Sequence, residues 1–258
     1  MSNTGEFKKL HQQNNILHIG SIWDAASALL FEKQAYKAVG TSSAAIADAL
    51  GYEDGEQMSF DELLIVVKSI IKRISIPLTV DIEGGYSRDV EGIVQNINRL
   101  IELGVVGVNL EDSYVGEDKQ RYIIDLPEFS HIIKAIKRHL FQQGRDIFLN
   151  IRTDAFIMGL DDPLDETMQR AEQYQQSGAD GLFVPCITDD TDIKKLVETI
   201  SIPVNVMAMP NLPSFSTLEK LGVKRVSSGP FIYQKISRNL EEILGYIQKG
   251  QSFSPVFE

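Results

Sequence analysis

The 258-residue sequence contains one cysteine, Cys186. A single cysteine cannot form an intramolecular disulfide, so the chain needs no oxidising compartment to fold. No stretch reaches the roughly 18 apolar residues of a membrane-spanning helix, and the first ten residues have no apolar signal-peptide core. We therefore expect a cytoplasmic protein without a membrane partner.

Positive charge is also scarce. Lysine and arginine total 25 against 36 aspartate and glutamate residues, which gives a net charge of −11. This negative field repels phosphate backbones and anionic lipids, so nucleic acid is excluded as an expected partner. If such a protein binds an acidic substrate, it needs local positive charge from a metal ion or an arginine.

Short apolar runs alternate with amphipathic stretches along the whole chain. The runs are continuous, as expected of parallel strands that are buried on both faces. Eight such runs with helical patterns between them, and no flexible linker, predict one (βα)₈ TIM-type barrel domain over residues 1–258. The predicted strands are residues 17–19, 38–41, 78–81, 107–110, 147–151, 181–184, 204–207 and 224–227.

Helix boundaries carry their own signals. Ser59 stands three residues before Glu62, the spacing of a capping box, and Asp162-Pro163 is typical of a helix start. Gly104 and Gly222 each follow a helical pattern and precede a strand, where a left-handed C-cap favours glycine.

Carboxylates gather at the predicted strand ends, where (βα)₈ barrels place their active sites. Asp81 ends the third predicted strand, Glu83 follows it, and Glu111 comes directly after the fourth. Three carboxylates this close cannot all stay ionised without a positive partner. Hard oxygen donors of this kind suit Mg²⁺, with Mn²⁺ as the alternative. A helix cap or a salt bridge at the rim is the competing interpretation for any one of them.

The other strand ends offer substrate contacts and exclude some chemistry. Arg152 comes directly after the fifth predicted strand, where its planar guanidinium suits a substrate carboxylate. Trp23 follows the first strand, and we take it as a candidate substrate contact, with packing as the alternative. No predicted strand ends in lysine, which disfavours a Schiff-base aldolase. No histidine stands at these ends, which disfavours a Ser-His-Asp site and a histidine-rich zinc site.

Together these stretches resemble the isocitrate lyase/phosphoenolpyruvate mutase superfamily. They occur in the order of the family over roughly residues 16–233. The matching segments are Gly40-Thr41-Ser42-Ser43, Leu50-Gly51-Tyr52-Glu53-Asp54, Val80-Asp81-Ile82-Glu83-Gly84-Gly85-Tyr86, Asn109-Leu110-Glu111-Asp112-Ser113, Arg152-Thr153-Asp154-Ala155-Phe156 and Gly178-Ala179-Asp180-Gly181.

The resemblance implies a metal site, a substrate site and an assembly. It implies direct Mg²⁺ binding by Asp81, with Asp54, Glu83 and Glu111 holding the waters of the ion. It implies that Ser42, Ser43 and Ala44, together with Arg152, grip the carboxylate and 2-oxo oxygen of a 2-oxo acid or enolpyruvate-like substrate. It also implies homodimers or homotetramers in which the eighth helix is exchanged between subunits.

The sequence departs from the family in the residues that select a reaction. The lyases of the family carry a Lys-Lys-Cys-Gly-His loop after the fourth strand, whereas residues 113–121 here contain neither cysteine nor histidine. The mutases have a histidine where this chain has Pro185. Met207, Ala208 and Met209 replace the Asn, Thr and Ser with which the lyases bind a second carboxylate.

Three functions remain open on these grounds. The first is an Mg²⁺-dependent carbon–carbon lyase acting on a small 2-oxo acid through an enolate-like intermediate, with Arg152 and Glu111 in the catalytic site. Tyr114 or Lys119, in a mobile loop, is its candidate proton donor. The second is a phosphoenolpyruvate or carboxyphosphonoenolpyruvate phosphonomutase. The third is a non-catalytic 2-oxo-acid-binding protein.

Overall fold

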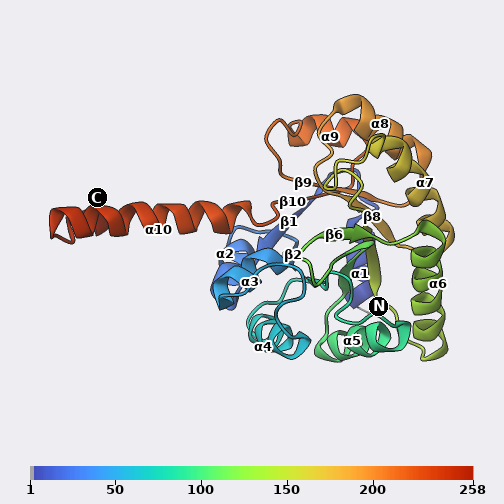
Figure 1. The fold of residues 1–258 in the computed structure, drawn as a ribbon, viewed down its shortest axis with the longest axis horizontal. Helices are drawn as coiled ribbons and strands as arrows, with labels where there is room; N and C mark the ends of the chain where they lie inside the picture. The colour runs from blue at the N-terminus through green and yellow to red at the C-terminus, as the bar shows by residue number, and fades with distance from the viewer. Residues whose placement is uncertain (1–2, 258) are drawn as a thin grey trace.

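The computed structural model describes residues 3–257, within which eight parallel strands close into a barrel in the order β1-β10-β9-β8-β7-β4-β3-β2 (Figure 1). Two further short strands form an antiparallel hairpin outside the barrel. The barrel strands are β1 (Leu17–Ile22), β2 (Ala38–Thr41), β3 (Leu78–Asp81), β4 (Gly107–Glu111), β7 (Phe148–Arg152), β8 (Gly181–Val184), β9 (Val204–Met207) and β10 (Arg225–Ser227).

All eight predicted strands are present, and the TIM-type fold is confirmed. Four have the predicted bounds, and the ends of the others differ by one to three residues. Continuous apolar runs identify these strands because their outer faces are covered by helices and their inner faces by the opposite wall of the barrel.

Helices α2 to α9 connect the successive barrel strands and pack around the barrel, whereas α1 precedes β1 and α10 follows β10. They are α1 (Asn3–Leu10), α2 (Ala25–Lys33), α3 (Ser43–Leu50), α4 (Phe60–Ile71), α5 (Val90–Leu103), α6 (Leu126–Gln142), α7 (Pro163–Gln176), α8 (Asp190–Thr199), α9 (Phe215–Leu221) and α10 (Phe231–Gly250), followed by the 3₁₀ turn η1 (Ser254–Val256).

The predicted caps are present. Ser59 caps α4 and exchanges hydrogen bonds with Glu62: the Ser59 amide donates to Glu62 Oε2 at 2.9 Å. Gly104 and Gly222 end α5 and α9 with positive φ angles of 94° and 92°. Asp162 is the N-cap of α7 as predicted, although its side chain makes no capping hydrogen bond.

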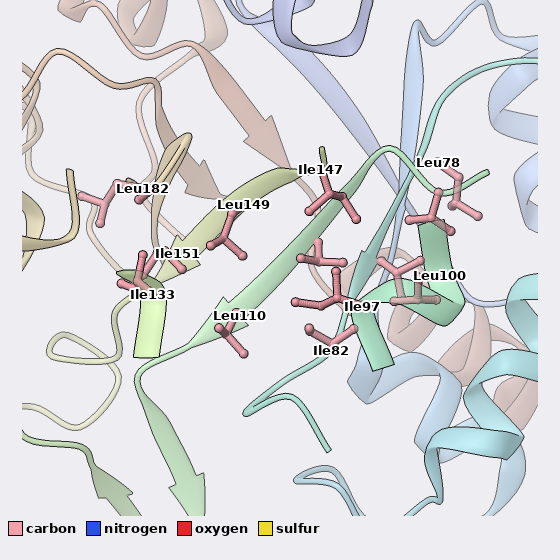
Figure 2. Close-up of a cluster of buried hydrophobic side chains, with 14 of the residues drawn as sticks. Leu78, Ile82, Ile97, Leu100, Leu110, Ile133, Ile147, Leu149, Ile151 and Leu182 are labelled. Carbon is pink, nitrogen blue, oxygen red and sulfur yellow. The ribbon is translucent and has the colours of Figure 1, made fainter. Parts of the chain in front are cut away.

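The main hydrophobic core lies between the strands and the surrounding helices. Figure 2 shows strand residues such as Leu110 and Ile151 packed with Ile97 of α5 and Ile133 of α6. A second cluster, which includes Phe7 of α1 and Phe148 of β7, fills the barrel opposite the active-site end. These two clusters hold the strand ends in place, so the residues that follow them have a rigid support.

Two segments depart from a regular barrel. The segment after β4 is the hairpin β5 (Ser113–Val115) and β6 (Arg121–Ile123), where a mobile loop was expected. Helix α10 extends away from the barrel and buries none of its side chains (Figure 1).

No helix in the described part of the chain is both long and apolar enough to span a membrane.

Candidate active site

A cavity of about 180 Å³ opens at the carboxyl ends of the barrel strands. Its volume is below the roughly 300–1,000 Å³ of pockets for drug-sized ligands, so it suits a small metabolite. Six residues predicted for the site line it: Ser42, Ser43, Ala44, Asp54, Asp81 and Arg152.

Asp81 is the buried carboxylate of this cavity. It ends β3, where its backbone amide donates to Thr41 Oγ1 at 2.8 Å and its Oδ2 accepts from Ser43 Oγ at 3.2 Å. Burial raises the pKa of Asp81, and the nearby charge of Arg152 opposes this shift. Asp54 lines the same cavity and adds to the negative charge around Asp81.

Glu83 is close to Asp81 and Asp54 but does not line the cavity. Its Oε2 accepts from the backbone amide of Glu56 at 2.8 Å, and its Oε1 accepts from the Tyr86 hydroxyl at 3.1 Å. Burial raises the pKa of the Glu83 carboxyl to about 9, and the carboxylates of Asp54, Glu111 and Asp81 act in the same direction. The carboxylates around Glu83 therefore carry more negative charge than their hydrogen bonds offset.

Glu111 is held by two arginines. Arg121 Nη1 donates to Glu111 Oε1 at 2.6 Å, and Arg152 Nη1 lies 2.8 Å from Glu111 Oε2. Both arginines also contact the buried Asp154, and Arg152 Nε donates to Asp154 Oδ1 at 2.6 Å. Burial acts to lower the pKa of Arg152, but Glu111 and Asp154 raise it above its usual value. Arg152 is thus a fixed cation in the cavity wall.

The carboxylates that face the cavity could bind a metal ion only if the ion keeps most of its waters. Residues 3–257 contain no cluster of three or more His, Cys, Asp or Glu side chains arranged to hold a metal ion. Mg²⁺ does not require such a cage, because it keeps several waters and is commonly bound by one or two carboxylates. Asp81 and Asp54 are the two carboxylates that face the cavity, so they fit this limited role.

Trp23 lies at the end of β1 but is absent from the cavity lining. Its ring packs edge-on against Tyr233 of α10, with centroids 5.2 Å apart. This contact favours the packing role that we weighed as the alternative to substrate binding.

The residue profile of the phosphoenolpyruvate phosphomutase family matches residues 7–247 of this chain. The chain belongs to that family. The predicted resemblance to the isocitrate lyase/phosphoenolpyruvate mutase superfamily is therefore confirmed.

Relatives of this family member include proteins with different names. The uncharacterized protein Rv1998c of Mycobacterium tuberculosis (strain H37Rv) is 31% identical over 227 residues, 88% of this chain and 83% of that protein. The 2-methylisocitrate lyase of Bacillus subtilis (strain 168) is 27% identical over 204 residues, 78% of this chain and 65% of the lyase.

Solved structures share the fold. A Burkholderia cenocepacia J2315 protein provisionally named a phosphonomutase superposes with a TM-score of 0.87 and 33% identity, covering 94% of this chain and 99% of that one. A phosphonopyruvate hydrolase solved in complex with oxalate and Mg²⁺ has a TM-score of 0.84 at 18% identity, covering 98% and 89% of the two chains.

In this member of the phosphoenolpyruvate phosphomutase family, the candidate proton donors point elsewhere. Tyr114 stacks on Tyr122 across the hairpin, with ring centroids 5.7 Å apart. Lys119 Nζ donates to Glu53 Oε2 at 2.8 Å, and its side chain is 75% exposed. Neither residue lines the cavity.

Sequence reasoning missed two arginines of this family member. Arg121 lies in the hairpin directly above Glu111, and a strand–turn–strand pattern with Gly116 at the turn would have been the signal for it. Arg225 lies on β10 at the cavity floor together with Asn109 of β4. A basic residue at the start of a predicted strand gives no local indication that it is buried.

Proposed function

We propose that this protein is an Mg²⁺-dependent enzyme that cleaves a carbon–carbon bond of a small 2-oxo acid through an enolate-like anion. The observation that supports this most is one small cavity in which Asp81 and Asp54 face the fixed guanidinium of Arg152. The lyase and mutase names among the relatives are consistent with chemistry of this class.

The metal is assigned to Asp81 and Asp54, with Glu83 and Glu111 as outer groups that hold its waters. A dication offsets the negative charge that raises the pKa of Glu83. When bound, Mg²⁺ stabilises negative charge on an enolate oxygen.

Arg152 and the start of α3 are assigned to the substrate carboxylate. The Arg152 guanidinium is pre-oriented by Glu111 and Asp154, so little side-chain entropy is lost when it binds an anion. Ser42 is the N-cap of α3, and the first residues of the helix, Ser43 and Ala44, line the cavity. A helix N-terminus favours a negative group at this position.

Tyr114 and Lys119 remain proposals for the proton donor. Because both lie outside the cavity lining, either role requires a displacement of the hairpin toward the cavity.

Product analysis tests this function. The protein is incubated with a panel of 2-oxo acids and 2-hydroxy acids with Mg²⁺, and products are followed by proton and phosphorus NMR. We expect a 2-oxo-acid product from carbon–carbon cleavage, and we expect EDTA to abolish it. Conversion of phosphonopyruvate to phosphoenolpyruvate would instead identify a mutase, and activity that survives EDTA would remove the metal from the mechanism.

A binding protein without turnover is the second candidate. One observation favours it: among the described residues that line the cavity, Asp54, Asp81, Arg152 and Arg225 are the only ones with charged side chains. Mg²⁺-linked binding of 2-oxo acids with no product from any of them would support this function over the first.

We also propose a cytoplasmic homodimer or homotetramer. The unburied helix α10 supports the assembly, and the single cysteine is consistent with the compartment.

A further inference from the structure

Arg225 is a buried cation with most of its hydrogen-bonding capacity unused. Its side chain lies inside the barrel and the residue is 2% exposed. Nη2 donates to Asn109 Oδ1 at 3.3 Å, whereas Nε and Nη1 have no partner among the described residues. A buried charge without a counter-ion is costly for a folded protein, so such a residue is a candidate for binding an anion.

Its neighbour on the next strand shows the same feature. Asn205 of β9 is the register partner of Arg225, it is 1% exposed, and both Oδ1 and Nδ2 lack a hydrogen-bond partner within residues 3–257. Asn109 on the opposite side of the barrel accepts from Asn150 Nδ2 at 2.9 Å as well as from Arg225. Unsatisfied donors on two adjacent strands are thus concentrated in the same layer of the barrel.

Two residues of this layer, Arg225 and Asn109, line the active-site cavity, and Arg152 lines it as well. Asn205 lies next to Arg225 on the adjacent strand and is not part of the lining. No described carboxylate forms an ion pair with Arg225, although the charge of Asp81 acts on it from nearby. Burial lowers the pKa of Arg225 to about 10, so the side chain stays charged at neutral pH.

We propose that Arg225 and Asn109, with Asn205 beside Arg225, form a second anion site that binds the distal carboxylate of a four-carbon 2-oxo dicarboxylic acid. This inference rests on the proposed function, in which Arg152 and the metal site take the 2-oxo acid end. The second group is a carboxylate because one guanidinium with neutral amide partners matches a single negative charge, whereas a phosphonate carries up to two charges. The small cavity limits the chain between the two anionic ends to a few atoms.

The neighbouring strand β9 offers no charge to the cavity. Its last residue, Met207, is part of the lining. The thioether of Met207 cannot pair with a carboxylate, so the adjacent β10 supplies the charge instead.

The test compares two ligands of the same length. Oxaloacetate ends in a distal carboxylate, whereas 2-oxobutanoate ends in a methyl group. Both are titrated calorimetrically with Mg²⁺ at low temperature. We expect the wild-type protein to bind oxaloacetate at least about 30-fold more tightly, the loss that follows truncation of a buried charged hydrogen-bonded pair. In Arg225→Met this preference falls to about one, while the affinity for 2-oxobutanoate stays unchanged.

Two further variants separate binding from structural roles. Arg152→Met lowers the affinity for both ligands to the same extent, because Arg152 binds the carboxylate next to the 2-oxo group, which both ligands have. Asn205→Leu lowers oxaloacetate affinity only. In the absence of ligand, Arg225→Met and Asn205→Leu unfold at a temperature about 3 °C or more above wild type, because each replaces unsatisfied buried polar atoms. A loss of stability in Arg225→Met would show a structural role and overturn the inference.

The remaining outcomes are also decisive. Equal wild-type affinity for oxaloacetate and 2-oxobutanoate overturns the second anion site and leaves the proposed function intact. Phosphonopyruvate binding as tightly as oxaloacetate, with the same loss in Arg225→Met, overturns the assignment to a carboxylate. If no 2-oxo acid binds with Mg²⁺, the proposed function fails and the second anion site fails with it.

Discussion

Arg152 connects the cavity to the charged groups behind it. It contacts Glu111 at 2.8 Å and Asp154 at 2.6 Å, and its side chain also lines the cavity. Asp112, the residue after β4, accepts from Tyr174 Oη of α7 at 2.7 Å and from the Asp154 backbone amide at 3.0 Å. The neighbouring carboxylates of Glu111 and Asp112 therefore have different partners: Glu111 pairs with the arginines of the site and Asp112 with the helix layer.

The residues at strand ends were predictable because barrel topology alone gathers them. To place Asp81 and Arg152 in the site, it was enough to recognise the strands that they end. Arg225 and Asn205 were not predictable, because polar residues inside a strand resemble an exposed face, and only the closed barrel shows that they are buried.

His11 supplies a pH prediction at the level of one residue. It is buried at the closed end of the barrel, stacked on Phe148 with ring centroids 4.2 Å apart. Burial, aided by the charge of Arg225, lowers the pKa of His11 from 6.5 to about 3. Between these values the unfolded chain binds a proton that the folded protein does not, so stability falls as pH decreases below about 6.5.

The expected size follows from this difference. Between pH 7 and pH 5, His11 accounts for a loss of about 2 kcal/mol in the free energy of unfolding. In His11→Gln the glutamine carries no titrating group, so this variant loses about 2 kcal/mol less free energy of unfolding between the two pH values. Urea unfolding at pH 7 and pH 5 measures the difference. His131→Gln, at an exposed position of α6, is the control and behaves as wild type. Equal losses in all three proteins would refute this assignment.

At the level of elements, the hairpin β5–β6 replaces a loop that we expected to be mobile. Its strands are three residues long, and three of the five residues between them are charged, so no apolar periodicity identified it. The barrel strands were predicted to within a few residues because they are apolar on both faces, which is not true of this hairpin.

Arg121 anchors the hairpin to the barrel, and its removal provides a prediction. Its Nη1 contacts Glu111, Ser113 and Asp154 at 2.6, 2.6 and 2.9 Å. We expect Arg121→Met to lower the free energy of unfolding by about 2 kcal/mol, because charged hydrogen bonds to buried carboxylates are lost.

The matched control lies in the same hairpin. Lys119 pairs with Glu53 at the surface, so Lys119→Met changes the free energy of unfolding by less than about 1 kcal/mol. Urea denaturation measures both variants. If the two substitutions have the same effect, Arg121 does not anchor the hairpin.

At the level of the whole molecule, α10 leaves one side of the barrel without a covering helix. The helix exposes Ile232, Ile236, Leu240 and Leu244 at four-residue intervals, which place them along one face. On the barrel, Leu29 and Leu30 of α2 and Phe215 of α9 are exposed. We propose that these exposed apolar residues of one chain pair with those of a second copy, which exchanges α10 across a twofold axis.

The extent of the single domain over residues 1–258 remains a prediction.

This arrangement predicts the mass in solution. Wild type should have at least twice the 28.8 kDa mass of one chain by light scattering. The double variant Leu240→Asp/Leu244→Asp places charges in the apolar stripe and should be a monomer. Glu241→Gln, on the same helix, should keep the wild-type mass. A monomeric wild type would contradict exchange of the helix.

The central claim is that Asp81 binds a dication that in turn binds the oxygens of a 2-oxo acid. Calorimetric titration of oxalate, an analogue of the enolate, tests it most directly when wild type and Asp81→Asn are compared with and without Mg²⁺. Asp118→Asn, an exposed carboxylate of the hairpin, is the control. We predict that wild type and Asp118→Asn bind oxalate only with Mg²⁺. We expect Asp81→Asn to weaken this binding at least about 100-fold, because the loss of a direct ligand costs no less than the largest losses seen for outer-shell groups. Oxalate binding that is independent of Mg²⁺, or unchanged in Asp81→Asn, would contradict the account.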